Sequence, residues 1–348
     1  MRARLTSSIS CSNRKPGSIW LSPSALVFLG ILSLLPWNVA FASDVAVDDV
    51  TRLKSYVVDL GGFVVDQPYV MMTGPTKVKY ISLPLQPNVK KVWLKGMMVQ
   101  AFSGENAEAK ESLTSLCHAA LLRETDVNGY PIRKILTISE GLERMEFPPG
   151  YGYPISPGEA IAVSAQVQNE DPALRKTYTY RFTIWYVEDN GSDGEKPLIP
   201  LMAKPFHAVG TRVALKDGVI CGEGDGSLVS NRSMHFLVPP GQHEFSQIYP
   251  PGGYAEKDVR LHEINMHFHR YGMKSTLIDR TDKKILWEGR ATYDTHGQIA
   301  HVDHYSSEEG ILIRANHEYE IRSVYNNPTN KNVDGMATMR SYYSIAGE

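Results

Sequence analysis

The chain has 348 residues, with 36 basic and 38 acidic side chains, and its formal net charge is −2. This balance, and the lack of any lysine- or arginine-rich run, exclude a typical nucleic-acid-binding protein. The 28 glycines and 21 prolines, with no long segment of helical periodicity, indicate many short strands separated by turns.

The first 42 residues have the pattern of a secretory signal peptide. Four basic residues precede a mostly apolar stretch from Ala25 to Ala40, and Ala40-Phe41-Ala42 supplies a small-x-small cleavage signal. An uncleaved membrane anchor is the alternative, but the apolar run is short for a spanning helix. We therefore expect a secreted or periplasmic protein with no stable membrane span after cleavage.

The remaining residues are long enough for two domains, each with its own core. Patterning is interrupted by glycines from Gly191 to Gly194 and by prolines at 197, 200 and 205. We therefore expect a signal peptide over 1–42, an N-terminal β-sandwich over 43–200 and a C-terminal β-sandwich over 201–348.

Several segments alternate apolar and polar side chains with the period of a β-strand. The predicted strands are Val78 to Leu83, Val89 to Val99, Ala160 to Val167, Tyr178 to Val187, Val259 to His267, Met273 to Asp279 and Ile311 to Tyr325. Short helices are predicted only at 44–58 and 106–116. The fold class is thus all-β, with two tandem jelly-roll-like sandwiches.

Cys11 lies in the signal peptide, so Cys117 and Cys221 are the cysteines of the mature chain. In an oxidising compartment these two could form a disulfide. Cys117 could instead bind a metal, since His118 follows it directly.

Two imidazoles stand one residue apart in the segment from Asn265 to Gly272. Residues i and i+2 of a strand point to the same face, so His267 and His269 can converge on one metal ion. A solvated polar face is the alternative for a bare His-x-His.

A third ligand is available in the segment from Ser323 to Met339. There a strand ends in an asparagine- and proline-rich loop, and a new strand opens near Met336. Two imidazoles and a thioether suit copper, because soft sulfur stabilises Cu(I) while nitrogen holds Cu(II). Considered alone, Met336 could equally be a core residue.

Five short motifs follow one another in this half of the chain. They are, in order, Val238-Pro239-Pro240-Gly241, His267-Phe268-His269 with Gly272 behind it, Thr292-Tyr293-Asp294, Val324-Tyr325-Asn326-Asn327-Pro328 and Asp334-Gly335-Met336. In order and spacing they resemble the C-terminal catalytic domain of the type II, ascorbate-dependent copper monooxygenases, which include peptidylglycine α-hydroxylating monooxygenase and dopamine β-monooxygenase.

The resemblance implies that His267, His269 and Met336 bind the copper at which O2 is activated, with Met339 as the register alternative. The family holds a second, electron-transfer copper in its first domain, and the matching positions here are Cys117, His118 and Gln168. Only one of them is a histidine, so this second site is weak and one copper ion is expected.

Positions that bind substrate in the peptide-amidating members also differ, being Asn265, Thr338 and Arg340 here. Peptidylglycine is therefore an unexpected substrate, although Arg340 could bind an anion. The family's glutamate before the methionine is replaced by Gly335.

The other histidines are expected to have lesser roles. His296, His301 and His304 are expected in a solvated loop, with a supporting role at the metal as the alternative. His262 has the opposite parity to His267 and is expected to face away from it unless a bulge intervenes. His207, His235, His243 and His317 are expected to be surface or satisfied core residues.

The sequence thus predicts an exported mononuclear copper protein. The expected activity is a copper-dependent monooxygenase or oxidase that uses an organic substrate and an external reductant, since the usual electron-transfer copper is missing. A non-catalytic periplasmic copper-binding or trafficking protein is the first alternative, and a structural or glycan-binding sandwich is the second.

Overall fold

The computed structural model describes residues 52–69, 73–123, 133–169, 171–191, 197–211 and 232–347. The predicted signal peptide and Cys221 lie outside these residues. The expected all-β class is confirmed, because the regular structure described consists of strands and one short 3-10 turn, η1 (Leu113–Ser115).

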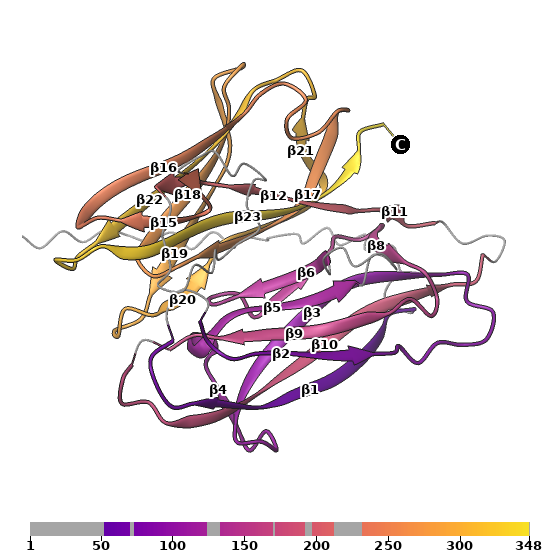
Figure 1. Ribbon diagram of the computed structural model, residues 1–348. Coiled ribbons are helices and arrows are strands. Elements are labelled where there is room, and N and C mark those ends of the chain that lie inside the picture. The colour runs from indigo at the N-terminus through magenta and orange to yellow at the C-terminus, as the bar shows by residue number, and fades with distance from the viewer. Residues whose placement is uncertain are drawn as a thin grey trace, which may run out of the picture. The chain divides into compact units, whose positions relative to one another are not determined.

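The first sandwich contains two sheets (Figure 1). The larger sheet has the order β1 (Lys54–Val65), β10 (Lys176–Asp189), β3 (Lys91–Ser103), β8 (Tyr151–Ile155), β11 (Ile199–Pro200), and β4 (Ala109–Glu111) and β7 (Arg144–Glu146) also pair with β3. The smaller has the order β2 (Thr76–Ile81), β9 (Ile161–Val167), β5 (Leu116–Arg123), β6 (Arg133–Ser139). Apolar side chains of both sheets, among them Phe182 and Leu121, form one core.

The second sandwich begins after Leu201 and has two sheets of five strands each. The first has the order β12 (Met202–His207), β23 (Val333–Ile345), β17 (Val259–Phe268), β21 (His304–Ile313), with β15 (His235–Val238) pairing with β23. The second has the order β16 (Gly241–Tyr249), β22 (Tyr319–Asn327), β18 (Gly272–Asp279), β19 (Lys284–Tyr293), β20 (Ile299–Val302). A small ladder joins β13 (Gly210–Thr211) and β14 (Arg232–Ser233). Apolar side chains of the two larger sheets, among them Ile264 and Ile321, form a separate core.

The sequence-based elements need three corrections. The helix predicted at 44–58 is wrong from Lys54 onward, where strand β1 pairs with β10. Its β-branched and aromatic residues, Tyr56 to Val58, fit a sheet better than a helix. At 106–116 the chain forms β4 and η1 instead of a helix, and Ile311 to Tyr325 is two strands separated at 314–318.

The two sandwiches contact each other directly, within one compact unit that spans Asp44–Glu348. Asn265 of β17 donates its side-chain amide to the backbone oxygen of Thr137, at 3.2 Å. Ser139 Oγ donates to the carbonyl of Met266, at 3.1 Å. The ring of Tyr342 packs edge-on against Phe147, with 4.9 Å between centroids. One face of the β17–β23 sheet is therefore covered by the first sandwich.

Within the part of the chain that is described, no helix combines the length and the apolar character needed to cross a bilayer.

Candidate metal centre at the junction of the two sandwiches

Strand β17 places His267 and His269 on the same face, with their ring centroids 5.2 Å apart. Phe268 between them is 3% exposed and belongs to the core of the second sandwich. The opposite face, which carries both imidazoles, is the one turned toward the first sandwich. The sequence pattern thus predicted the shared face, although a solvated face was the alternative.

Strand β23 places Met336 beside this pair. The backbone N–H of His269 donates to the carbonyl of Met336, at 3.1 Å. Along β23, Gly335, Ala337 and Met339 are buried, while Met336 lies on the alternate, partly exposed face. Met339 is fully buried in the core of the second sandwich, so it is wrong as a register alternative for the ligand.

The first sandwich contributes Cys117 to the same place. Its Sγ and one ring nitrogen each of His267 and His269 lie within 4.8 Å of one another. Cys117 is a free thiol and is 3% exposed. The structure therefore moves Cys117 from the weak second site of the sequence analysis to the His-x-His pair.

A bulge in β5 explains this placement. The register between β5 and β9 shifts between Leu116 and His118, so Cys117 is an extra residue without a partner on β9. A bulge locally breaks the alternation of side chains and turns the extra one to a new direction. Both Cys117 and its neighbour His118 can therefore face the second sandwich.

Asp334 holds His269 in a defined orientation. Nδ1 of His269 donates a short hydrogen bond to Oδ2 of Asp334. Burial disfavours the charged imidazole, but the carboxylate of Asp334 outweighs burial and raises the pKa of His269 to about 10. Burial likewise opposes ionisation of Asp334, yet the charge of His269 keeps the pKa of Asp334 below its usual value. This pairing leaves Nε2 of His269 buried and without a hydrogen-bond partner among the described residues.

His235 belongs to the same cluster, and the sequence analysis missed this role. It is 2% exposed, its Nδ1 lies 3.5 Å from Oδ1 of Asp334, and its ring centroid lies 5.1 Å from that of His269. Neither ring nitrogen has a hydrogen-bond partner within the described part of the chain. It is therefore not a satisfied core residue. The available signal was its alternation with buried Phe236 and Val238, which assigns it to the face of Met336.

His118 and Gln168 do not complete a separate site with Cys117. Lys134 Nζ lies 3.3 Å from Nε2 of His118. Burial, together with the charge of Lys134, lowers the pKa of His118 to about 3, so this imidazole is neutral. The amide of Gln168 donates instead to the carbonyl of Thr114 and to the carboxylate of Glu140.

The positions that correspond to substrate-binding residues of the family lie on the covered face. The side-chain amide of Asn265 donates a hydrogen bond to the carbonyl of Thr137, and Arg340 donates a guanidinium N–H to the carbonyl of Lys134. The side chain of Thr338 contacts Nδ1 of His207 at 3.0 Å, which supports the prediction of a satisfied His207. Arg340 is thus engaged between the sandwiches.

Most remaining histidines lie away from the centre. His296, His301 and His304 are exposed as expected, but His301 lies in β20 and His304 begins β21, so of the three only His296 lies in a loop. The exception allowed for His262 applies, because β17 has a bulge between Leu261 and Glu263 and His262 faces the first sandwich. The ring of His262 stacks at 4.0 Å on Tyr151 of the first sandwich, and both its nitrogens have partners.

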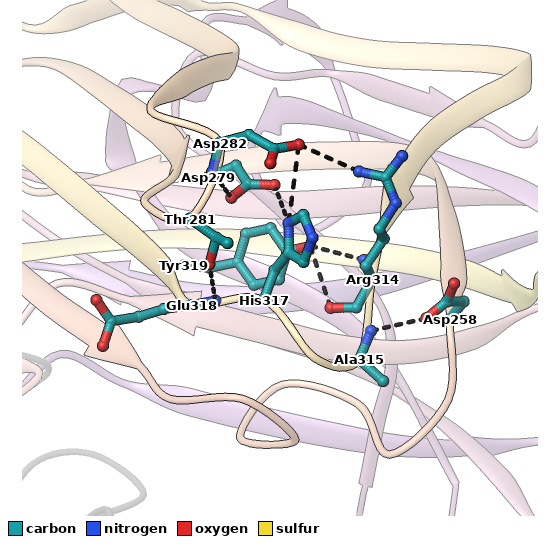
Figure 2. Close-up of polar contacts among 9 residues, drawn as sticks. All are labelled: Asp258, Asp279, Thr281, Asp282, Arg314, Ala315, His317, Glu318 and Tyr319. Atoms are coloured by element: carbon teal, nitrogen blue, oxygen red, sulfur yellow. Dashed lines mark hydrogen bonds and ion pairs between the residues drawn. The ribbon is translucent and has the colours of Figure 1, made fainter.

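A second histidine–carboxylate cluster lies at the turns that follow β18 and β21 (Figure 2). Nδ1 of His317 donates to Oδ2 of Asp279 at 2.7 Å, and Oδ1 of Asp279 accepts the N–H of Asp282 at 3.0 Å. Arg314 pairs with Asp282 at 3.2 Å. Figure 2 shows Asp282 joined by dashed lines to both Arg314 and His317, so internal contacts account for this group.

The donor set at the junction fits a copper ion. Nδ1 of His267, Nε2 of His269 and Oδ1 of Asp334 are all buried without a hydrogen-bond partner among the described residues. Buried polar atoms are nearly always paired, so several orphans at one point indicate a missing ligand. Imidazole nitrogens with sulfur are the atoms that copper prefers.

No family model matches this chain, and no curated protein matches it. Among solved structures, the STIV MCP is similar at 9% identity and a TM-score of 0.33, covering 84% of this chain and 97% of the other. A peptide-N(4)-(N-acetyl-β-D-glucosaminyl) asparagine amidase is similar at 9% identity and a TM-score of 0.36, with the same coverage. The infectious bursal disease virus VP2 subviral particle is similar at 13% identity and a TM-score of 0.22, covering 85% and 72%. Similarities at these levels do not indicate a function.

Proposed function

We propose that this protein is an exported mononuclear copper protein, in which His267, His269 and Met336 bind one copper ion. The observation that carries the proposal is the pair of buried, unpartnered imidazole nitrogens on one face of β17, one ring of which is fixed by Asp334. A carboxylate that accepts Nδ1–H leaves Nε2 as the metal-binding atom, which is the usual arrangement around a ligating histidine.

The activity proposed for this centre is that of a copper-dependent monooxygenase or oxidase. A bound copper ion would supply one-electron redox chemistry. The motifs around His267, His269 and Met336 resemble those of the type II copper monooxygenases, which supports this activity. A single centre needs a further electron from an external reductant or from the organic substrate itself.

A non-catalytic copper-binding or trafficking protein is the second candidate. It is favoured by the burial of the centre between two sandwiches, where the side chains of His269 and Asp334 are each only 11% exposed. An enzyme needs access for O2 and substrate, whereas a carrier benefits from a closed site.

Copper uptake tests the proposal, and O2 consumption separates the two candidates. The mature chain should bind one copper ion, and His267→Ala and Met336→Ala should reduce binding. His243→Ala is a matched control, because His243 lies on β16, in the other sheet of the second sandwich, and its Nε2 contacts the carbonyl of Pro240 at 3.0 Å. A protein that binds no copper, or whose binding survives His267→Ala, would contradict the proposal. Reductant-dependent O2 consumption by the loaded protein favours the enzyme, and tight binding without it favours the carrier.

A further inference from the structure

We propose that Cys117 is a thiolate ligand of this copper centre, so that the two sandwiches share one metal ion. This inference rests on the proposed function and adds a ligand from the other half of the chain. The centre then has the imidazoles of His267 in β17 and of His269 directly after it, a thiolate from β5 and the thioether of Met336 from β23.

The geometry brings the three strong donors together. Cys117 Sγ, a nitrogen of His267 and a nitrogen of His269 are all within 4.8 Å of one another. Metal–sulfur and metal–nitrogen bonds of about 2.0–2.3 Å place ligand atoms about 3.3–4 Å apart, so only small side-chain movements are required.

Neighbouring side chains support a cation at this point. His235 is 2% exposed, and neither of its nitrogens has a partner among the described residues. Its ring lies against His269, and it shares Asp334 with that residue. Its Nδ1 lies 3.5 Å from Oδ1 of Asp334, which is long for a hydrogen bond, and a buried imidazole without one is costly unless a ligand is bound nearby.

Charge balance also favours a metal-bound thiolate. Binding of a cupric ion to the thiol and to Nε2 of His269 breaks the S–H and Nε2–H bonds, releases both protons to solvent, and forms Cu–S and Cu–N bonds with the sulfur and nitrogen lone pairs. No electron is transferred in this step. The thiolate and the carboxylate of Asp334 together carry two negative charges, which offset those of the divalent ion in a site with little access to water.

The ligand set that includes Cys117 is of a different type from a set of two histidines and one methionine. A trigonal group of two histidines and one cysteine, with a weak methionine, is typical of copper sites that transfer electrons. Two histidines and one cysteine also suit zinc, so the identity of the metal is part of the test.

The experiment is copper loading of the full mature chain, followed by visible absorption and copper X-ray absorption spectroscopy. The wild-type protein should show an intense visible thiolate-to-Cu(II) charge-transfer band and a sulfur shell with a short Cu–S distance. Cys117→Ser should lose the band and the short distance while retaining nitrogen scattering. Met336→Leu should retain the band, and Cys221→Ser is the matched control for removal of a thiol.

The outcomes separate this inference from the proposed function. Stoichiometric copper without a charge-transfer band in the wild-type protein overturns the role of Cys117 and leaves the His267/His269/Met336 site intact. A sulfur shell that persists in Cys117→Ser and disappears in Met336→Leu does the same. No copper uptake, or preferential retention of zinc in competition with copper, overturns both. Should Cys117→Ser fail to fold, the wild-type spectrum and Cys117→Ala provide the test.

Discussion

The described part of the chain contains two buried histidine–aspartate clusters that look alike in isolation but differ in what surrounds them. At the turns after β18 and β21, Asp279 uses both carboxylate oxygens, one for His317 and one for the backbone of Asp282. At the junction of the sandwiches, Asp334 orients His269 through Oδ2, its Oδ1 lies 3.5 Å from Nδ1 of His235, and Nε2 of His269 has no hydrogen-bond partner among the described residues.

The difference shows how a structural pair can be told from a ligand-binding one. Both clusters contain the same residue types, histidine and aspartate. In each, the ligand atoms of three potential metal-binding side chains lie within 4.8 Å of one another. Of these two clusters, only the one at the junction has ring nitrogens without a hydrogen-bond partner among the described residues, and only there do imidazoles lie beside a thiol. Unsatisfied buried atoms, and not the clustering of titratable groups, therefore distinguish the two.

The largest expected effect is on stabilisation by copper. Copper at roughly 1,000 times its Kd should stabilise the wild-type chain by about 4 kcal/mol, because it binds only the folded state. His267→Ala should abolish this gain, and His317→Ala should leave it intact despite a lower starting stability. Thermal unfolding with and without copper measures both. Equal copper stabilisation of the two variants would remove the distinction between the clusters.

Asp279→Asn should lower the free energy of unfolding by about 2–3 kcal/mol at pH 7, because a buried charged hydrogen bond to His317 is lost. Although burial opposes it, hydrogen bonding to the backbone of Asp282 and to His317 lowers the pKa of Asp279 in the folded protein. A lowered carboxyl pKa stabilises the fold above the unfolded pKa. The deficit should therefore shrink as the pH falls from about 4 through the folded pKa. Denaturant unfolding across pH tests this, and a constant deficit would argue against the pairing.

Asp334→Asn should weaken copper binding by about 10- to 100-fold, because His269 loses the carboxylate that fixes its Nδ1 proton. The variant should retain the metal:protein ratio at saturation. Competition with a chelator of known affinity measures the change, with Asp279→Asn as the matched control at the other cluster. An unchanged affinity in Asp334→Asn would mean that Asp334 serves only the fold.

The smallest expected effect, on the free energy of unfolding, is at Glu263. This buried acid differs from Asp279 and Asp334 in its surroundings. It lies on β17, is fully buried, and its oxygens lack hydrogen-bond partners among the described residues. Burial raises the pKa of Glu263 well above its usual value. The folded state then binds the proton more tightly than the unfolded state, so stability is highest below pH about 4.5 and falls as the pH rises toward the folded pKa.

Glu263→Gln should therefore stabilise the chain by about 1 kcal/mol at pH 7 and lose this advantage in acid. Denaturant titrations at both pH values check the sign. A variant that is less stable than wild type at pH 7 would indicate that the carboxylate has a charged partner.

Local sequence patterns predicted many of the strands and the shared face of His267 and His269. The alternation from Val259 to His267 predicted β17, and its period placed His267 and His269 on one face. The bulges at Cys117 and at His262 were not predictable, because each arises from pairing with a distant strand. The approach of β5 to β17 was also hidden, since contacts between sandwiches leave no periodic signal. His235 was missed because its strand has only four residues, so its alternation with Phe236 and Val238 is a weak signal.

Because of the bulge at Cys117, the proposed centre is complete only when the two sandwiches are in contact. With the thiol in the coordination sphere, neither sandwich can assemble the site alone, and copper affinity becomes linked to the equilibrium between docked and undocked sandwiches. A bound copper ion would then stabilise the contact between the sandwiches. Removal of the ion by a chelator should shift the equilibrium toward the undocked sandwiches before either core unfolds.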